Sequence, residues 1–512
     1  MMGKDTSKNK ALAINMISSA VAVGVHLAIS FFLSPYIVAK LGVEANGFVT
    51  LASNFVGYAS LISIALNSMA GRFITIKFYQ DDLAEANKYY TAVTLGNYVL
   101  SLFMVIPAVL CVIYLEKFIN ISADILWDVK LLFALVFLNY LVRTTFSSWN
   151  TATFVTNKLY IQSMRDMQSQ LIRVAILLGL FFLIKPYVYY MGVASLMATI
   201  YTVGYAFYYK KKLMPQLKVR IASFNKNYFI ELIASGIWNT INQLGLLLLS
   251  GLDLLIANVF VGAEAMGILS LGKILPNVLV QLTTALKSVF TPTFIMKYAQ
   301  GDIEGLKLEL KKAMKITGII LTIPLSLVII FGNEFYQLWV PSQDAGLLQT
   351  LSVLTIFGYI FTVSTTVLFD VFVVVNKLKT NAILVVISGI ASTGLVFILL
   401  GNTNLGLLAI AGVSSVANII RNLCFTVPFG AKYLNLKWNT FFPEVGYSVL
   451  SVLILNAIGY GIENIVVIDS WLKLAAYAAI TGVLGLLINS FIVLNKTERN
   501  YLVKAVKSKV HL

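Results

Sequence analysis

The chain has 512 residues, of which 59% are apolar and only 12% are charged. Soluble globular domains are about 45–50% apolar and about 25% charged, so this composition excludes an ordinary soluble protein and indicates a membrane protein. The net charge of +16 does not indicate a nucleic-acid binder, because the basic residues are scattered through short gaps between long apolar runs. We expect them to face anionic lipid headgroups and to set the orientation of the chain.

About fourteen apolar runs are long enough to cross a membrane, since a helical span needs roughly 20 apolar residues. In chain order the predicted spans are 12–38, 47–69, 91–115, 131–153, 167–184, 188–208, 230–259, 266–290, 315–331, 347–369, 381–400, 405–428, 445–462 and 473–494. The first run is too long for the apolar region of a signal peptide, so we expect it to be retained as a span. The predicted fold class is an all-α membrane protein.

Lysine and arginine are divided unevenly between alternate loops. One set of loops, which includes both termini, holds 28 basic residues, whereas the opposite set holds five. Because cytoplasmic loops carry the excess of basic residues, this asymmetry predicts that the N- and C-termini are both cytoplasmic.

An internal repeat appears when residues 42–54, "GVEANGFVTLASN", are compared with residues 262–274, "GAEAMGILSLGKI". At a constant offset of 220, eleven of the 41 pairs from 42 to 82 are identical. Six spans separate the copies, so the two halves are expected to share one orientation, with any substrate site between them.

The repeat divides the chain into four predicted parts. These are a six-helix lobe at 1–210, a basic cytoplasmic linker at 211–229, a second six-helix lobe at 230–428, and two additional helices with a basic tail at 429–512. The charged segments 73–90 and 294–312 show partly helical apolar spacing, which favours amphipathic helices in the cytoplasmic interface over ordinary loops.

The segments "YIVAKLGVEANGF" (36–48) and "LDLLIANVFVGAEAMGILSLGKIL" (252–275), with this span arrangement, resemble the polysaccharide transporters of the multidrug/oligosaccharidyl-lipid/polysaccharide exporter superfamily. The resemblance is closest to Wzx-type flippases of O-antigen and capsule repeat units. It implies two lobes in a V around a central cavity in the bacterial inner (cytoplasmic) membrane. It also implies alternating access and a substrate that is an undecaprenyl-diphosphate-linked oligosaccharide. The superfamily leaves a cation-coupled multidrug antiporter as an alternative.

Ionisable residues inside spans are costly and usually face a bundle interior or a water-filled cavity. The predicted spans contain five basic residues against two carboxylates; these are Arg143, Arg173, Lys273, Lys287 and Arg421, and Asp253 and Asp370. A positive interior suits a lipid diphosphate, whereas a transporter of cations would favour carboxylates. Arg143 is the first candidate for a diphosphate or sugar contact, followed by Arg173 and Arg421. The alternative is a structural ion pair for Arg143 and Arg421, and snorkelling to the inner interface for Arg173.

Other polar residues have two interpretations each. Lys273 and Asp253 lie at similar distances from the turn at Gly262, which predicts a salt bridge between adjacent helices, although Lys273 could also line the cavity. Lys287 is near the cytoplasmic end of its span and is expected to snorkel. His26 is a candidate proton-sensitive coupling residue, as is Asp370, but a buried core histidine is the favoured interpretation.

Asn239 and Asn242 form a polar cluster with Trp238 in the seventh span. Such side chains can bind sugar hydroxyls and stack on sugar rings, or they can join helices by hydrogen bonds within the membrane. We consider them candidate substrate-binding residues.

Catalytic chemistry is not indicated. Gly267, Gly272 and Lys273 resemble a phosphate-binding loop, but Ile274 replaces its Ser/Thr and no strand precedes it. Two histidines and two cysteines exclude a His- or Cys-based metal cluster. We therefore expect a transporter without a cofactor, driven by a proton or sodium gradient, rather than a glycosyltransferase or polymerase. Its expected partners are the lipid-linked oligosaccharide, membrane lipids and polysaccharide polymerase machinery, with no nucleic acid.

Overall fold

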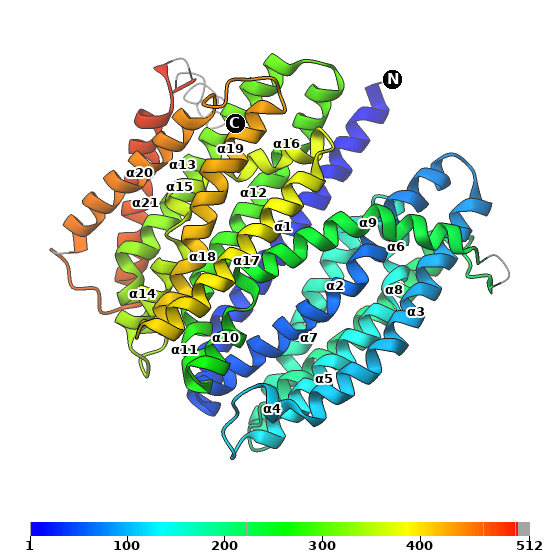
Figure 1. The fold of residues 1–512 in the computed structure, drawn as a ribbon, viewed down its shortest axis with the longest axis horizontal. Helices are drawn as coiled ribbons and strands as arrows, with labels where there is room; N and C mark the ends of the chain where they lie inside the picture. The colour runs from blue at the N-terminus through cyan, green and yellow to red at the C-terminus, as the bar shows by residue number, and fades with distance from the viewer. Residues whose placement is uncertain (1, 222–223, 464, 497, 500–512) are drawn as a thin grey trace. The chain divides into compact units, whose positions relative to one another are not determined.

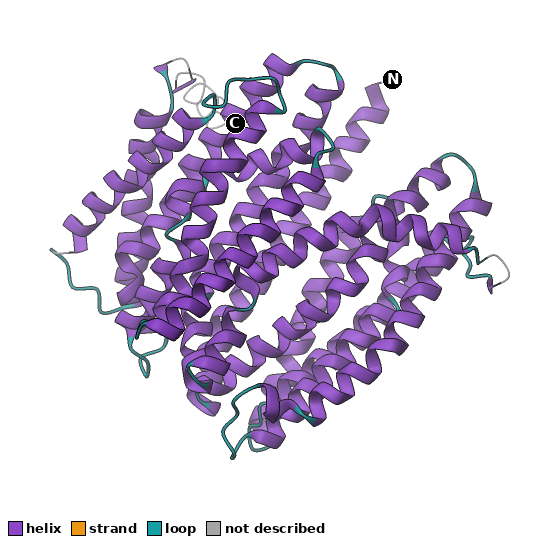
Figure 2. Ribbon diagram, in the orientation of Figure 1, coloured by secondary structure: helices purple, strands orange, loops and turns teal. Residues whose placement is uncertain are grey.

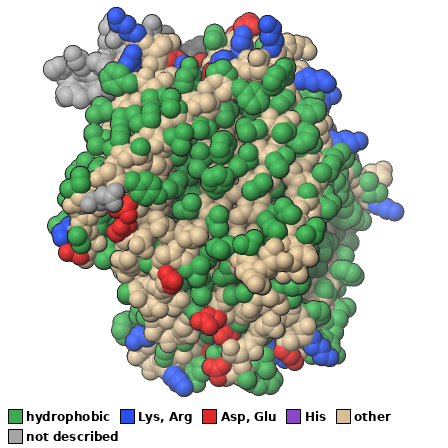
Figure 3. All heavy atoms as spheres, turned by 60° about the vertical axis from the view of Figure 1, so that its left-hand side comes forward, with side chains coloured by type: hydrophobic (Ala, Val, Ile, Leu, Met, Phe, Trp, Pro, Cys, Tyr) green, Lys and Arg blue, Asp and Glu red, His purple; other side chains and the backbone are tan. Residues whose placement is uncertain are grey.

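The computed structural model describes residues 2–221, 224–463, 465–496 and 498–499, and in these ranges it is helical with no strand (Figure 2). Thirteen helices are long and apolar enough to cross a membrane, or fourteen when the pair Leu126–Thr145 and Ser147–Val155, bent by 53°, counts as one span. Each of the fourteen matches one predicted span, so the prediction of an all-α membrane protein is confirmed. Figure 3 shows a broad apolar face with charged side chains gathered towards its upper and lower edges, as expected for a lipid-facing surface.

The chain forms two compact units: unit 1 is Met1–Leu247 with Leu254–Gly267, and unit 2 is Leu248–Asp253 with Ile268–Leu512. The helices that lie wholly or partly in unit 1 are α1 (Met2–Leu41), α2 (Val43–Tyr79), α3 (Leu83–Ile113), α4 (Leu115–Phe118), α5 (Leu126–Thr145), η1 (Ser147–Asn150), α6 (Thr151–Val155), α7 (Leu159–Leu183), α8 (Tyr190–Leu213), α9 (Lys226–Leu246), α10 (Asp253–Phe260) and α11 (Ala263–Gly272). Figure 1 labels most of these elements in chain order.

Unit 2 contains the π-helical turn η3 (Leu247–Gly251), the second half of α11, and the helices that follow it. These are α12 (Ile274–Ala299), α13 (Ile303–Trp339), α14 (Ala345–Ile356), α15 (Tyr359–Thr362), η4 (Ser364–Leu368), α16 (Phe369–Val374), α17 (Leu378–Asn402), α18 (Leu407–Arg421), η5 (Asn422–Thr426), α19 (Val427–Lys432), α20 (Phe442–Glu463) and α21 (Trp471–Val493).

Helix α9 belongs to unit 1, which differs from the predicted start of a second lobe at residue 230. Its residues Leu232 and Gly236 are buried, and a Cβ atom on Gly236 would overlap the carbonyl group of Ala65 on α2. The absence of a side chain at Gly236 therefore allows α9 to lie directly on the α2 backbone. A buried core shared by α2, α3, α6 and α9 follows from this close approach. The sequence repeat and the compact units thus divide the chain at different places.

The helices α20 and α21, predicted as an additional pair, lie beside α13 in unit 2 (Figure 1). Polar contacts fix both helices to α13: Asn456 Nδ2 donates to Ser326 Oγ at 3.3 Å, and Asn489 Nδ2 donates to Thr322 Oγ1 at 2.9 Å. Lys311 on α13 forms an ion pair with buried Glu444 on α20 at 3.2 Å. The pair is therefore an integral part of unit 2.

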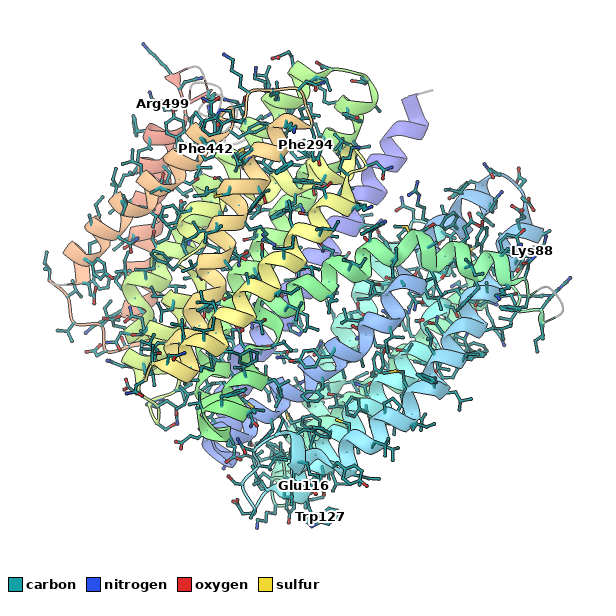
Figure 4. The ribbon with its side chains drawn as sticks, in the orientation of Figure 1. Lys88, Glu116, Trp127, Phe294, Phe442 and Arg499 are labelled. Atoms are coloured by element: carbon teal, nitrogen blue, oxygen red, sulfur yellow. The ribbon has the colours of Figure 1, made fainter. Side chains whose placement is uncertain are left out.

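Aromatic residues close one end of this bundle. Phe294 on α12 is buried in the same core cluster that Phe442 of α20 packs against (Figure 4).

At one end of unit 1, Lys130 forms an ion pair with Glu116 at 2.6 Å and lies 5.7 Å from the ring centre of Trp127 (Figure 4).

The internal repeat is visible in the turn geometry. Gly42 and Gly262 both have positive φ, as do Asp81 and Gly301, and each pair is 220 residues apart. The next residue caps the following helix in both copies: Asp82 Oδ1 accepts from the Glu85 N–H at 3.0 Å, and Asp302 Oδ1 accepts from the Gly305 N–H at 2.8 Å. These equivalent turns support a duplication.

The same turns correct the expectation of amphipathic interfacial helices at 73–90 and 294–312. In the first segment α2 continues to Tyr79, and α3 begins at Leu83 after a tight turn. In the second, the Lys297 ammonium group and the Gly305 N–H hold the pKa of Asp302 below its usual range, which keeps the capping carboxylate charged. Both segments are connections between long helices, because a residue with positive φ, Asp81 or Gly301, interrupts the helix and the aspartate after it begins the next one.

Candidate functional site

The most distinctive polar group in unit 2 lies where α12, α16 and α18 meet. We call it the cationic cluster and define it as Lys287, Thr291, Phe369, Asp370, Asn418 and Arg421. It is formed because the 3₁₀ turn η4 interrupts the tenth span and begins α16 at Phe369, which places Asp370 in the first helical turn.

Asp370 is paired with a residue that the sequence analysis did not connect to it. Lys287 Nζ lies 2.8 Å from Asp370 Oδ1, and the Thr291 hydroxyl, one turn later on α12, donates to Oδ2. The carboxylate side chain is 5% exposed and the lysine side chain is 28% exposed. The expectation that Lys287 snorkels to the membrane surface is therefore wrong, because a buried carboxylate within reach stabilises the ammonium group more than the interface would.

Arg421 completes the cluster from α18 and has no carboxylate partner among the residues that the structure describes. It is 6% exposed, its Nη2 donates to Asn418 Oδ1 at 2.8 Å, and its Nε is buried without a hydrogen-bond partner. Its guanidinium carbon lies 5.3 Å from the ring centre of Phe369, and Lys287 Nζ lies 5.5 Å from the same ring. Two cations therefore flank one aromatic ring.

The cluster carries two positive charges and one negative charge. Aromatic faces attract cations, but this interaction does not replace an anionic partner for a buried charge. A guanidinium group donates hydrogen bonds and accepts none. The free donors of Arg421 therefore suit a phosphate or carboxylate ligand.

Lys273 and Asp253 form the ion pair predicted from their spacing around the turn. The lysine side chain is 14% exposed and the carboxylate 7%, and Lys273 also donates to the Ser250 carbonyl at 3.3 Å. Lys273 lies at a break between α11 and α12 because Pro276 cannot donate to the carbonyl of Gly272. The Ser352 hydroxyl donates to that free carbonyl at 2.6 Å, so the break is held by tertiary contacts.

Changing Asp253 to Asn is expected to destabilise unit 2 by about 3–5 kcal/mol, because it leaves a half-buried ammonium group without its counter-charge. The double variant D253N/K273M should recover most of this loss. Thermal unfolding in detergent measures both, with D469N as the control, since Asp469 forms an exposed pair with Lys473. A D253N variant as stable as D469N would contradict a structural role for the pair.

The candidate cations of unit 1 are distributed differently. Arg143 is exposed near the end of α5, just before the 53° bend, and makes no ion pair or hydrogen bond with any described residue. Arg173 lies on α7, with its Nε buried and unpaired. His26 on α1, which packs on α7, is exposed, so the favoured expectation of a buried core histidine is wrong.

Asn239 and Asn242 lie half-buried on α9, the helix that packs on α2 in unit 1. Asn242 and Trp238 interact with other groups of the protein, as helix-joining residues would. Their role in substrate binding stays a prediction.

The repeat shows that Lys287 has a neutral equivalent. Asn67 stands 220 residues earlier on α2, where its side chain exchanges hydrogen bonds of 2.8 and 2.9 Å with Asn97. Ser147 of η1 joins this network by accepting from Asn97 at 3.0 Å. The same position in the repeat thus holds an amide network in one copy and a charged pair in the other.

Within the described residues, no group of three or more His, Cys, Asp or Glu side chains could hold a metal ion. The residues that sequence reasoning missed are on α7 and α8. Arg165 donates to the side chains of Asn150 and Asp166, and Tyr201 donates to Gln168 Oε1 at 2.6 Å. For α8, the sequence contains a pattern that could have indicated this face of the helix: tyrosines four residues apart in "YTVGYAFYYK" (201–210).

Comparison with known proteins gives a consistent result. Residues 11–297 match the family model described as "polysaccharide biosynthesis protein". The chain is 28% identical over 492 residues to a protein described as uncharacterized membrane protein EpsK of Bacillus subtilis (strain 168), covering 96% of this chain and 97% of that protein.

Two solved structures show the fold. The lipid II flippase MurJ in an inward closed conformation aligns with a TM-score of 0.66 and 15% identity, over 93% of this chain and 98% of that one. A multidrug resistance MATE family transporter of the MOP superfamily, inward-facing, aligns with a TM-score of 0.64 and 12% identity, over 83% of this chain and 98% of that one. The chain therefore has the fold of these transporters.

Proposed function

Because the chain belongs to the polysaccharide biosynthesis protein family, we propose that it is a flippase for polyprenyl-diphosphate-linked oligosaccharides. Its substrate would be an O-antigen, capsule or exopolysaccharide repeat unit carried on undecaprenyl diphosphate. The fold shared with a lipid II flippase supports this proposal, since lipid II is a lipid-linked saccharide. The family membership supports a role in polysaccharide assembly.

The observation that carries the proposal is the unpaired buried charge of Arg421. A guanidinium group without a carboxylate partner inside a membrane span is costly, so its presence indicates an anionic ligand. A diphosphate offers several acceptor oxygens, and Arg421 and Lys287 lie 5.3 and 5.5 Å from the centre of the same Phe369 ring, so two cationic donors lie beside one aromatic side chain. Arg143 and Arg173 would contact the diphosphate or the sugars from unit 1.

Translocation would proceed by alternating access around a central cavity, with both termini in the cytoplasm of a bacterial cell whose inner membrane holds the protein. Energy would come from a proton or sodium gradient rather than from a bound cofactor. Polymerase machinery would consume the flipped product.

A cation-coupled multidrug antiporter is supported less well. Such a transporter requires a carboxylate that is free to bind its cation. Asp253 and Asp370 are each paired with a lysine in unit 2, which leaves an excess of positive charge.

The proposal predicts that deletion of the gene causes lipid-linked repeat units to accumulate in the cytoplasmic leaflet of the host membrane. Mass spectrometry of the lipid-linked pool measures the accumulation. In proteoliposomes, the same extracted lipids should become accessible in the opposite leaflet only when the protein is present. Normal surface polysaccharide in a deletion strain without a second flippase would contradict the proposal, and efflux of a fluorescent organic cation would support the antiporter instead.

A further inference from the structure

Helix α8 carries three tyrosines at four-residue spacing, Tyr201, Tyr205 and Tyr209, and residues at this spacing lie on one face of a helix. We call them the tyrosine ladder. The ring centres of Tyr201 and Tyr205 are 5.9 Å apart, and those of Tyr205 and Tyr209 are 4.7 Å apart. Eight residues of helix separate the first from the last, so the ladder extends over about 12 Å.

Polar groups on α7 border this ladder. Tyr201 donates to Gln168 Oε1 at 2.6 Å, and Gln168 is exposed. One turn earlier on α7, Arg165 donates to Asp166 Oδ1 from Nε at 3.0 Å and from Nη2 at 2.8 Å. Because the Arg165 charge is balanced by Asp166, this border is rich in donors and acceptors but carries no net charge. It differs in this respect from the cationic cluster of unit 2.

Two simpler explanations of the ladder fit less well. Tyrosines of an interfacial aromatic belt lie at headgroup depth, which the basic residues at the end of α8 mark, beginning with Lys210. Tyr201 is nine residues before Lys210, about 14 Å along the helix, and so lies away from that depth. Core aromatic residues are buried, as Tyr190 at the start of α8 is, whereas all three tyrosines of the ladder are only half-buried. The ladder therefore presents aromatic surface and polar groups together.

We propose that the tyrosine ladder, bordered by Gln168, Arg165 and Asp166, is a carbohydrate-binding track for the glycan part of the substrate. Sugar rings have apolar C–H faces that stack on aromatic rings, and their hydroxyl groups exchange hydrogen bonds with amide, carboxylate and guanidinium groups. A neutral track suits a neutral polyhydroxyl chain, while the cationic cluster suits the diphosphate. This assignment rests on the proposed flippase function and adds the location of glycan recognition.

The direct test is binding of the glycan alone to the purified full-length protein. The probe is the repeat-unit oligosaccharide released by mild acid from the lipid-linked pool of the deletion strain, observed by saturation-transfer difference NMR. The Y201L/Y205L variant should bind about tenfold more weakly, because it removes two aromatic contacts. The Y201F/Y205F variant keeps both rings and should retain most of the binding, and Y98L is the control for an exposed tyrosine elsewhere in unit 1.

Transport separates this inference from the proposed function. In proteoliposomes, Y201L/Y205L should slow translocation of polyprenyl diphosphate carrying the whole repeat unit more than translocation of the same lipid carrying only its first sugar. Equal slowing of both, or unchanged binding of the released oligosaccharide, would overturn the carbohydrate track. A wild-type protein that translocates the lipid but does not bind the oligosaccharide would overturn the track and leave the flippase function standing. No translocation by the wild type would contradict the flippase function itself.

Discussion

Replacing Arg421 with alanine should lower translocation of the lipid-linked oligosaccharide by about 10- to 100-fold, the loss expected when a charged hydrogen-bonding group is removed from its ligand. The fold should tolerate the change, because Arg421 has no carboxylate partner among the described residues that would be left unpaired. Lysine at this position should restore part of the activity, since it keeps the charge but not the planar donor geometry. The measurement is initial flux in proteoliposomes at equal amounts of inserted protein.

The matched control for Arg421 is K432A. Lys432 lies on the neighbouring helix α19, is exposed, and also contacts an aromatic ring, with its Nζ 5.9 Å from the centre of Phe429. It should lose little flux. In unit 1, R143A should also reduce flux without loss of protein. Unchanged flux in R421A, combined with a lower unfolding temperature, would show that Arg421 stabilises the bundle and does not bind the substrate.

Removing Lys287 and removing Asp370 should affect stability to different extents and should have opposite effects on diphosphate binding. The K287M variant leaves the carboxylate of Asp370, 5% exposed, with only the Thr291 hydroxyl, so we expect a destabilisation of about 3–5 kcal/mol. D370N leaves the more exposed ammonium group, which is easier to hydrate, and should destabilise less. Because D370N raises the net charge of the cationic cluster, it should also strengthen binding of a polyprenyl diphosphate.

Denaturation in detergent and equilibrium binding of radiolabelled undecaprenyl diphosphate measure these two effects. K287M should bind the diphosphate more weakly than the wild type, because it removes one cation of the cluster. The double variant K287M/D370N should regain the stability that K287M loses but should still bind the diphosphate weakly. If K287M bound the diphosphate as tightly as the wild type, the cluster would not be the diphosphate site, and the pair would have only a structural role.

The number and position of the spans could be predicted from the sequence because burial in lipid requires long apolar runs, whatever their tertiary contacts. The interruptions could not be predicted in the same way. The bend after Thr145 and the break at Lys273 depend on which distant groups take over the freed backbone carbonyls, as Ser352 does for Gly272. The membership of α9 in unit 1 likewise depends on its close approach to Ala65, which no local pattern records.

Whether an ion pair could be predicted depended on how far apart its two residues are in the sequence. The Lys273–Asp253 pair was found because both residues flank one turn, so their depth follows from counting along two antiparallel helices. Lys287 is in the eighth span and Asp370 in the tenth, with the whole of α13 between them, and no such count relates them. The tyrosine ladder could not be predicted for a different reason: its side chains are uncharged, and in an apolar span only ionisable residues stand out as functional candidates.

The dependence of α13 on α20 and α21 has a consequence for biogenesis. Ribosomes deliver spans to the membrane from the N-terminus onward, and about 100 residues separate the end of α13 at Trp339 from the start of α20 at Phe442. Until α20 and α21 arrive, Lys311, Ser326 and Thr322 lack the partners they have in the folded unit. We therefore expect α13 to be held by insertion factors or by its earlier neighbours during synthesis, and a ribosome stalled before residue 442 to leave it open to quality-control proteases.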